Sequence, residues 1–412
     1  GQIAATAAAT FTAAKDIAVT GAFVGGDTAT FTAARNLSLT GGIQATNDLA
    51  LTASSGSFTS SGTLNAEHDL TVSAGTGLTL GGQTAVANAT SLAAGNDLTL
   101  AGTFNGQGTG QLTAGYDLNG SGSTGFAQSA TFTAGHDIQL SGPAQSAGLT
   151  MTAANDLALN NVASTGAMAL RANGAAGGGT ITVNGAVGAA GAMTAQAAQD
   201  IVIQGTLSSG ATATLTAQRS VAVPGVINAG GDLTINAQQG ALSATGGIES
   251  GGDLTIATAQ DLTLGASTSA TGDVKLQAGD NLTRGLMLVG KNGSLGAGTT
   301  VFDAVNGTSC AAFSGSATLL SGADVDLAGA LQPNAIQATA AGSMALGALT
   351  SATTIALTAK GSPTAAVGGP GDVTLNGAIA SPGAFTVQAA RDATVYGALA
   401  CGASCSVTAG RN

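Results

Sequence analysis

The sequence predicts an all-β fold, a right-handed parallel β-helix in which one coil takes about 20 residues and three short strands. Three observations predict it: a unit that recurs every 20 residues, alternation of apolar and polar residues within the unit, and a composition of small side chains. Gly accounts for 65 of 412 residues, and aromatic residues for only 3%. Small side chains suit a core one coil wide, whereas a globular core needs bulky residues to fill it.

The first strand of the unit has one larger apolar residue among small residues, and an Asp or Asn follows at the end of the strand. It reads FTAAKD at 11–16, FTAARN at 31–36, LTAGYD at 112–117 and FTAGHD at 132–137. Apolar and polar residues alternate in this way on a strand that is buried on one face. The inward residues are therefore expected to stack from coil to coil, Phe11 over Phe31 for example.

The Asp or Asn is followed by a second strand, and a third completes the coil. The second reads DIAVTG from Asp16, NLSLTG from Asn36 and DIQLSG from Asp137. Each has the order apolar, polar, apolar and then Gly, which predicts a short strand closed by a turn. Ala22-Phe23-Val24 fits the third strand of an early coil.

The spacing of the Asp and Asn residues predicts how the coils stack. Steps of 20 residues separate Asp16 from Asn36, Asp97 from Asp117, Asp117 from Asp137, Asp253 from Asp273 and Asp261 from Asn281. Three strands and three turns in 20 residues make one turn of a solenoid, with neighbouring coils about 4.8 Å apart. The preference for right-handed crossovers sets the predicted hand.

The repeat runs through the whole chain, which predicts one continuous rod over 1–412, on the order of 100 Å long for roughly 20 coils. Both ends fall inside the repeat, so the chain is expected to be a fragment of a longer protein. The period lengthens in three places, and loop excursions are predicted near 171–179, 284–312 and 360–371.

Charge argues against several partners and ligands. The net charge is −11, and an acidic surface repels phosphate backbones, so nucleic acid is not an expected partner.

The Asp that recurs in each repeat is replaced by Asn36, Asn281 and Ser220 in some copies. This exchange favours residues that form turns, with side chains bonded to nearby backbone N–H groups, over metal ligands. The two histidines, His68 and His136, lie far in sequence from the cysteines. No metal site and no cofactor are predicted.

Cysteine use is sparse. Cys401 and Cys405 have a spacing that could close a small disulfide loop, and Cys310 is left over as a buried small residue or a free thiol.

Catalytic chemistry has little basis in the sequence, and no catalytic residue is predicted. Asp324 and Asp326 are two apart and could project together, but such a pair is more often a solvated face than a glycosidase site. Outward Thr pairs such as Thr30 and Thr32 are found on β-helices that bind ice, but Thr is also a common exposed strand residue, and ice binding is not the expected function.

The unit x-D-L-x-L-x-G with a period near 20 resembles the repeat region of filamentous haemagglutinin, over nearly the whole chain. That family consists of exoproteins exported by two-partner secretion, and its relatives include contact-dependent inhibition toxins. The resemblance implies secretion from a Gram-negative cell through an outer-membrane β-barrel transporter. The NPNL and NPNG motifs, the VENN boundary and RGD do not occur in this sequence, so no adhesive residue is carried over.

The leading expectation is therefore a non-enzymatic shaft of a secreted or cell-surface adhesin. It would present a distal binding module to a receptor or glycan of a host or neighbouring cell. Three alternatives stay open: the stalk of a contact-dependent inhibition toxin, a self-associating subunit of an extracellular filament, and a β-helix enzyme that degrades polysaccharides.

Overall fold

The computed structural model describes residues 1–174, 177–297, 301–303, 311–361 and 371–411, with only the backbone at 301–303. The regular structure of these residues is β-strand throughout. Within the same ranges there is no helix of the length and apolar character needed to cross a bilayer.

The strands form two compact units, one of residues 1–199 and 204–210, the other of 200–203 and 211–412. Each unit is a parallel β-solenoid with three strands per coil, which confirms the predicted fold class.

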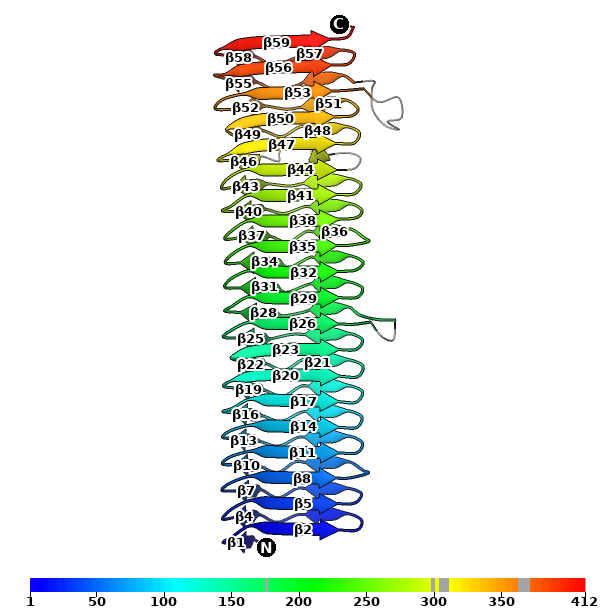
Figure 1. The fold of residues 1–412 in the computed structure, drawn as a ribbon, viewed down its shortest axis with the longest axis vertical. Coiled ribbons are helices and arrows are strands. Elements are labelled where there is room, and N and C mark those ends of the chain that lie inside the picture. The colour runs from blue at the N-terminus through cyan, green and yellow to red at the C-terminus, as the bar shows by residue number, and fades with distance from the viewer. Residues whose placement is uncertain (175–176, 298–300, 304–310, 362–370, 412) are drawn as a thin grey trace. The chain divides into compact units, whose positions relative to one another are not determined.

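The first two coils of the first unit show how the strands pair. They consist of β1 (Ile3–Ala5), β2 (Ala9–Ala13) and β3 (Ile17–Val19), then β4 (Phe23–Gly25), β5 (Ala29–Ala33) and β6 (Leu37–Leu39). Each strand pairs in parallel with its counterpart one coil later, β1 with β4, β2 with β5 and β3 with β6. Repetition of this pairing builds a first, a second and a third sheet, whose strands stack coil upon coil within the unit (Figure 1).

The core of each coil is formed by alternate residues of its strands. In β5, Ala29, Phe31 and Ala33 are buried, and the two Thr residues between them point outward. The rings of Phe11 and Phe31 stack with centroids 4.6 Å apart, as the sequence predicts. Such ladders give each coil an apolar interior that only the neighbouring coils complete.

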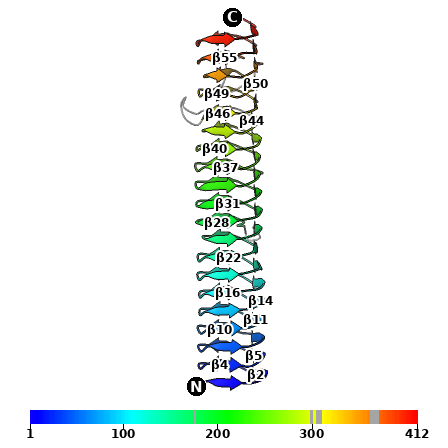
Figure 2. The same ribbon diagram turned by 90° about the vertical axis from the view of Figure 1, so that its left-hand side faces the viewer.

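The second unit repeats this architecture. In its second sheet, β32 (Ala213–Ala217), β35 (Leu233–Ala237) and β38 (Leu254–Thr258) pair in register. The buried ladder of these strands is Leu215, Ile235 and Ile256, each 0% exposed. The view in Figure 2 separates the strands of the first sheet, such as β37 (Ile248–Ser250) and β40 (Thr268–Ala270), from those of the second sheet.

Glycines line the turn that leads from the third sheet to the first. Gly82, Gly102 and Gly122 occupy this turn in successive coils. A Cβ at Gly102 would meet the carbonyl oxygen of Gly82 far inside contact distance, and one at Gly122 would meet that of Gly102. The backbones of neighbouring coils therefore approach so closely here that a side chain does not fit.

Two lengthened coils share the same glycine geometry at their bases. After β26 (Met168–Ala172), Gly174 and Gly179 have φ of 71° and 105°, and a Cβ on Gly179 would lie 2.8 Å from Cα of Gly174. After β53 (Ile355–Ala359), Gly361 and Gly371 have φ of 72° and 92° and approach each other in the same way. This left-handed region favours glycine.

The register resumes directly after both lengthened coils. Leu159 pairs with Val183 across the first, and Leu346 pairs with Leu375 across the second. The predicted excursions near 171–179 and 360–371 thus coincide with these coils, although 175–176 and 362–370 lie outside the described residues.

The excursion predicted near 284–312 is too broad. This range contains β43 (Met287–Val289), β44 (Gly293–Ala297) and β45 (Val301–Asp303), all in register with their neighbours. The strands were missed because the lengthened step was measured along one turn of the coil, from Asn281 to Asp324, whereas Asn292 lies at the other turn, 19 residues after Asp273. The rest of the predicted excursion, at 298–300 and 304–310, lies outside the described residues.

Candidate functional site

The Asp and Asn residues of the repeat lie at the turns, where they join neighbouring coils. The Oδ1 atom of Asp253, for example, accepts a hydrogen bond of 2.8 Å from the backbone N–H of Asp273, its equivalent 20 residues later. The same bond recurs along two turns of the coil, with acceptors Asp16, Asn36, Asp48, Asp69, Asp97, Asp117, Asp137, Asp156, Asp200, Asp232, Asp261, Asp273, Asn292, Asp324 and Asp372.

These bonds add one detail to the sequence prediction. The side chains were expected to bond nearby backbone N–H groups, and the structure places those N–H groups in the next coil. This occurs because stacking brings residue i within hydrogen-bonding distance of residue i+20.

Arginines extend this arrangement at four turns. Arg391 binds Asp372 with both Nε, at 2.7 Å, and a terminal guanidinium nitrogen. The equivalent pairs are Arg35 with Asp16, Arg219 with Asp200 and Arg411 with Asp392. The hydrogen bond from arginine is the main cause that lowers the pKa of Asp16, Asp200 and Asp372 below the ordinary range of an aspartate.

These lowered pKa values predict acid sensitivity. A carboxylate whose pKa is lower in the folded chain stabilises the fold above its unfolded pKa of about 3.9, and this contribution is lost as pH falls toward the folded pKa. Urea denaturation of Asp372→Asn should show a loss of stability against the wild type at pH 7 that shrinks at pH 3. An equal loss of stability at both pH values would contradict a lowered pKa of Asp372 in the folded chain.

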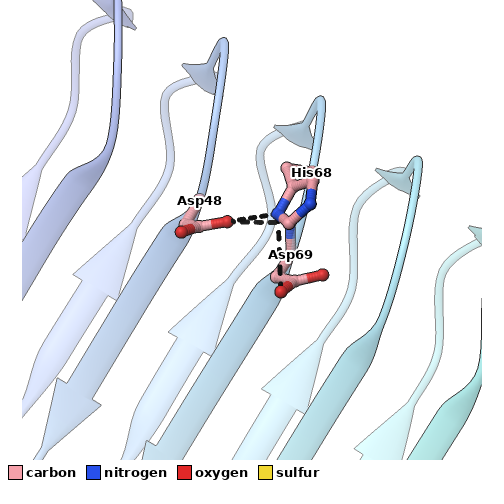
Figure 3. Close-up of side chains that lie close together, drawn as sticks. All are labelled: Asp48, His68 and Asp69. Atoms are coloured by element: carbon pink, nitrogen blue, oxygen red, sulfur yellow. Dashed lines mark hydrogen bonds and ion pairs between the residues drawn. The ribbon is translucent and has the colours of Figure 1, made fainter.

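A different cluster forms where a histidine precedes the turn Asp. His68 lies just before β11 (Leu70–Ala74), and Asp48 lies before β8 (Leu49–Ala53) of the preceding coil. The Nδ1 atom of His68 is 2.7 Å from Oδ1 of Asp48 and 3.4 Å from Oδ2 of Asp69 (Figure 3). The bond to Asp48, followed by the charge of Asp69, raises the pKa of His68 above its ordinary value.

The second histidine forms the same kind of cluster at the other turn of the coil. His136 lies before β21 (Ile138–Leu140), and Asp117 lies before β18 (Leu118–Gly120). The Nδ1 atom of His136 is 3.0 Å from Oδ1 of Asp117 and 3.4 Å from Oδ2 of Asp137. The ring also stacks on Tyr116, with centroids 4.4 Å apart and planes 5° from parallel.

Sequence reasoning missed both clusters, although the signal was present. Asp48 precedes His68 by 20 residues and Asp117 precedes His136 by 19, which is one coil in each case. The informative separation is the one between each histidine and an aspartate one period away, and not the one between the histidines and the cysteines.

The two carboxylates singled out from the sequence, Asp324 and Asp326, have different surroundings in the described part of the chain. Asp324 accepts a 2.7 Å hydrogen bond from the backbone N–H of Ser343, as the other turn aspartates do. Asp326 lies on the outward face of β48 (Val325–Leu327) and is exposed. Asp324 therefore has the structural role of the other turn aspartates, and Asp326 is a solvated residue on the outer face of its strand.

The cysteines and one arginine complete the residues of interest. Cys401 ends β58 (Leu399–Cys401) and Cys405 lies in β59 (Ser404–Ala409), with Cα atoms 6.0 Å apart and the two sulfurs in contact. Cys310 lies outside the described residues. Arg284, in β42 (Leu282–Arg284), is 0% exposed, which no sequence pattern indicated.

Family models match most of the chain. The model described as "Haemagglutinin repeat" matches residues 1–55, 44–102, 105–172, 163–237 and 347–404. A second model, described as "Hemagglutinin repeat", matches residues 208–355. Comparisons with curated proteins and with solved structures each gave no significant match.

Proposed function

Because the chain belongs to the filamentous haemagglutinin repeat family, we propose that it is the shaft of a cell-surface adhesin and presents a distal binding module. The family places the chain among secreted or cell-surface bacterial proteins, and its repeats are structural rather than enzymatic. The observation that carries the proposal is the regular parallel stacking of coils within each unit. A stack of this kind gains length without redesign of its core, because each coil touches only its neighbours.

Membership of the two-partner secretion family suggests how the shaft leaves the cell. We propose export from a Gram-negative bacterium through an outer-membrane β-barrel transporter. Coils can form one after another outside the cell, since each needs only the preceding coil as a template. The distal module would then meet a receptor or glycan on a host or neighbouring cell.

We also propose that the coils continue as one rod over 1–412, as the sequence predicts. Small-angle scattering of the purified chain should then give a maximum dimension on the order of 100 Å, from roughly 20 coils at 4.8 Å. A dimension near half of this value would contradict continuity.

Competition for cell binding tests the shaft function. The purified chain, added in large excess, should leave attachment of the intact exoprotein to its target cells unchanged, because the shaft itself holds no receptor contacts. Deletion of 98–117 from the intact exoprotein removes one coil, so that Leu78 pairs with Leu118 in place of Leu98. Attachment should be preserved in this variant. Inhibition of attachment by the purified chain would show instead that this chain is the binding module.

The cysteine geometry supports a disulfide between Cys401 and Cys405, which we propose forms on export, since disulfides persist in oxidising environments. Intact mass spectrometry of the secreted chain after alkylation without reduction should find these two thiols unmodified. Alkylation of both would contradict the disulfide.

A further inference from the structure

The two histidine clusters are built from the same parts over three successive coils. The first coil supplies an Asp, the second a His-Asp pair and the third an Asn. These residues are Asp48, His68, Asp69 and Asn88 in one cluster, and Asp117, His136, Asp137 and Asn155 in the other.

In each cluster, protein donors hold the aspartate that follows the histidine. Oδ1 of Asp69 accepts hydrogen bonds from Asn88 Nδ2, at 2.8 Å, and from the backbone N–H of Ala89, at 2.9 Å. Oδ1 of Asp137 accepts the equivalent two bonds, from Asn155 Nδ2 and the backbone N–H of Asp156, both at 2.9 Å. These bonds leave Oδ2 of each aspartate turned toward the histidine Nδ1 (Figure 3 shows the first cluster).

We propose that each cluster binds one divalent transition-metal ion such as Zn²⁺, through the histidine Nδ1 atom and one oxygen from each of the two aspartates. In each cluster these three ligand atoms lie within 4.8 Å of one another. A tetrahedral ion with bonds of about 2.0–2.2 Å separates its ligands by roughly 3.4 Å, so the 3.4 Å from Nδ1 to Oδ2 already fits. The shorter distance from Nδ1 to the other aspartate, 2.7 Å in the first cluster and 3.0 Å in the second, increases to roughly 3.4 Å as the ion replaces that hydrogen bond.

The ligand set selects the class of ion. One imidazole and two carboxylates suit zinc and its neighbours, whereas calcium takes six to eight oxygen ligands and magnesium keeps an octahedral oxygen shell. Two carboxylate charges and a neutral imidazole complement a divalent ion. The side chain of His68 is 53% exposed, so the ion can enter from solvent and complete its coordination with water.

Hydrogen bonds from the third coil hold the ligands in place in both clusters, and a stacked ring does so in the second cluster. A ligating carboxylate in a metal site is commonly hydrogen-bonded through its other oxygen, as Asp69 and Asp137 are. Tyr116 fixes the plane of the His136 ring. Since the ligands come from two coils, the bound ion would clamp these coils along the solenoid axis.

Metal titration of the purified chain, without a histidine tag and freed of metal by a chelator, tests this proposal. Calorimetry with Zn²⁺, together with the visible absorption of Co²⁺, should give about two ions per chain for the wild type. His68→Gln and His136→Gln should each bind about one ion, and the double variant none. Zn²⁺ should raise the melting temperature of the wild type and not that of the double variant.

Asp273→Asn is the matched control. Like the cluster aspartates, Asp273 accepts a hydrogen bond from a backbone N–H of the next coil, that of Asn292. It also accepts one from Asn292 Nδ2, at 3.1 Å, but no histidine precedes it. This variant should keep two ions. If a histidine variant fails to fold, Asp69→Asn serves in its place and should weaken one of the two sites at least tenfold. The proposal is overturned if the wild type binds no ion, or if the double variant binds as many as the wild type.

Discussion

Substitution of Gly102 by alanine should destabilise the first unit by about 3 kcal/mol, the upper part of the usual range for overpacking. Gly102 lies in the turn between β15 (Leu98–Leu100) and β16 (Phe104–Gly106), where the new Cβ would overlap the carbonyl oxygen of Gly82. The obstacle is backbone, so no rotamer change relieves it, and the two coils must separate. Urea denaturation followed by circular dichroism would measure the loss.

The control for this change is Gly77→Ala. A Cβ at Gly77 would meet only the carbonyl oxygen of Asp97, at 3.7 Å, which is an ordinary contact. Both variants add one methyl group at a turn glycine of the same unit, so they differ in the approach of the neighbouring coil. Equal stability of the two variants would show that the close approach at Gly102 does not constrain the fold.

Ile235→Asp should have the largest effect in the second unit, on the order of 4 kcal/mol. The side chain of Ile235 is fully buried between Leu215 and Ile256, and an aspartate there would place a carboxylate in an apolar interior with no partner. The affected coil and its neighbours should open first, because they share the buried ladder. Hydrogen exchange read by mass spectrometry should show lost protection centred on β32, β35 and β38.

Thr234→Asp separates burial from the introduced charge. Thr234 is the adjacent residue of β35 and points to the outer surface, between Thr214 and Thr255. The same aspartate at this position stays hydrated and should change stability by less than about 0.5 kcal/mol. If both variants lost the same protection, inward and outward positions would have been wrongly assigned.

Much of the fold was predictable because two periodicities act on the same residues. Alternation along a strand separates Phe31 from its Thr neighbours, and the 20-residue step places Phe11 on Phe31. Ala22-Phe23-Val24 was predicted as a strand one residue away from the observed β4. Local patterns are sufficient for the fold because the described strands pair with their counterparts in the neighbouring coils.

The sites were harder to predict, because their geometry depends on contacts between coils. The sequence shows His68 and Asp48 as distant residues, and only the stacked turns join them. For the same reason the sequence predicts that the turn aspartates bond backbone N–H groups, but it does not show that these groups lie in the next coil. Arg284 illustrates a further limit, since its burial breaks the rule that charged residues face outward.

The paired glycines at the bases of the lengthened coils have a consequence for how such a protein evolves. Gly361 and Gly371 bring the chain back to its point of departure, and the next strand, β54 (Val373–Leu375), aligns with β51 (Met344–Leu346) as if nothing intervened. The described strands on either side keep the register of an ordinary coil, although nine residues separate the two glycines in the sequence. A change in the number of residues at such a place therefore leaves the paired strands of the neighbouring coils aligned, which gives evolution a position for insertion within a periodic fold.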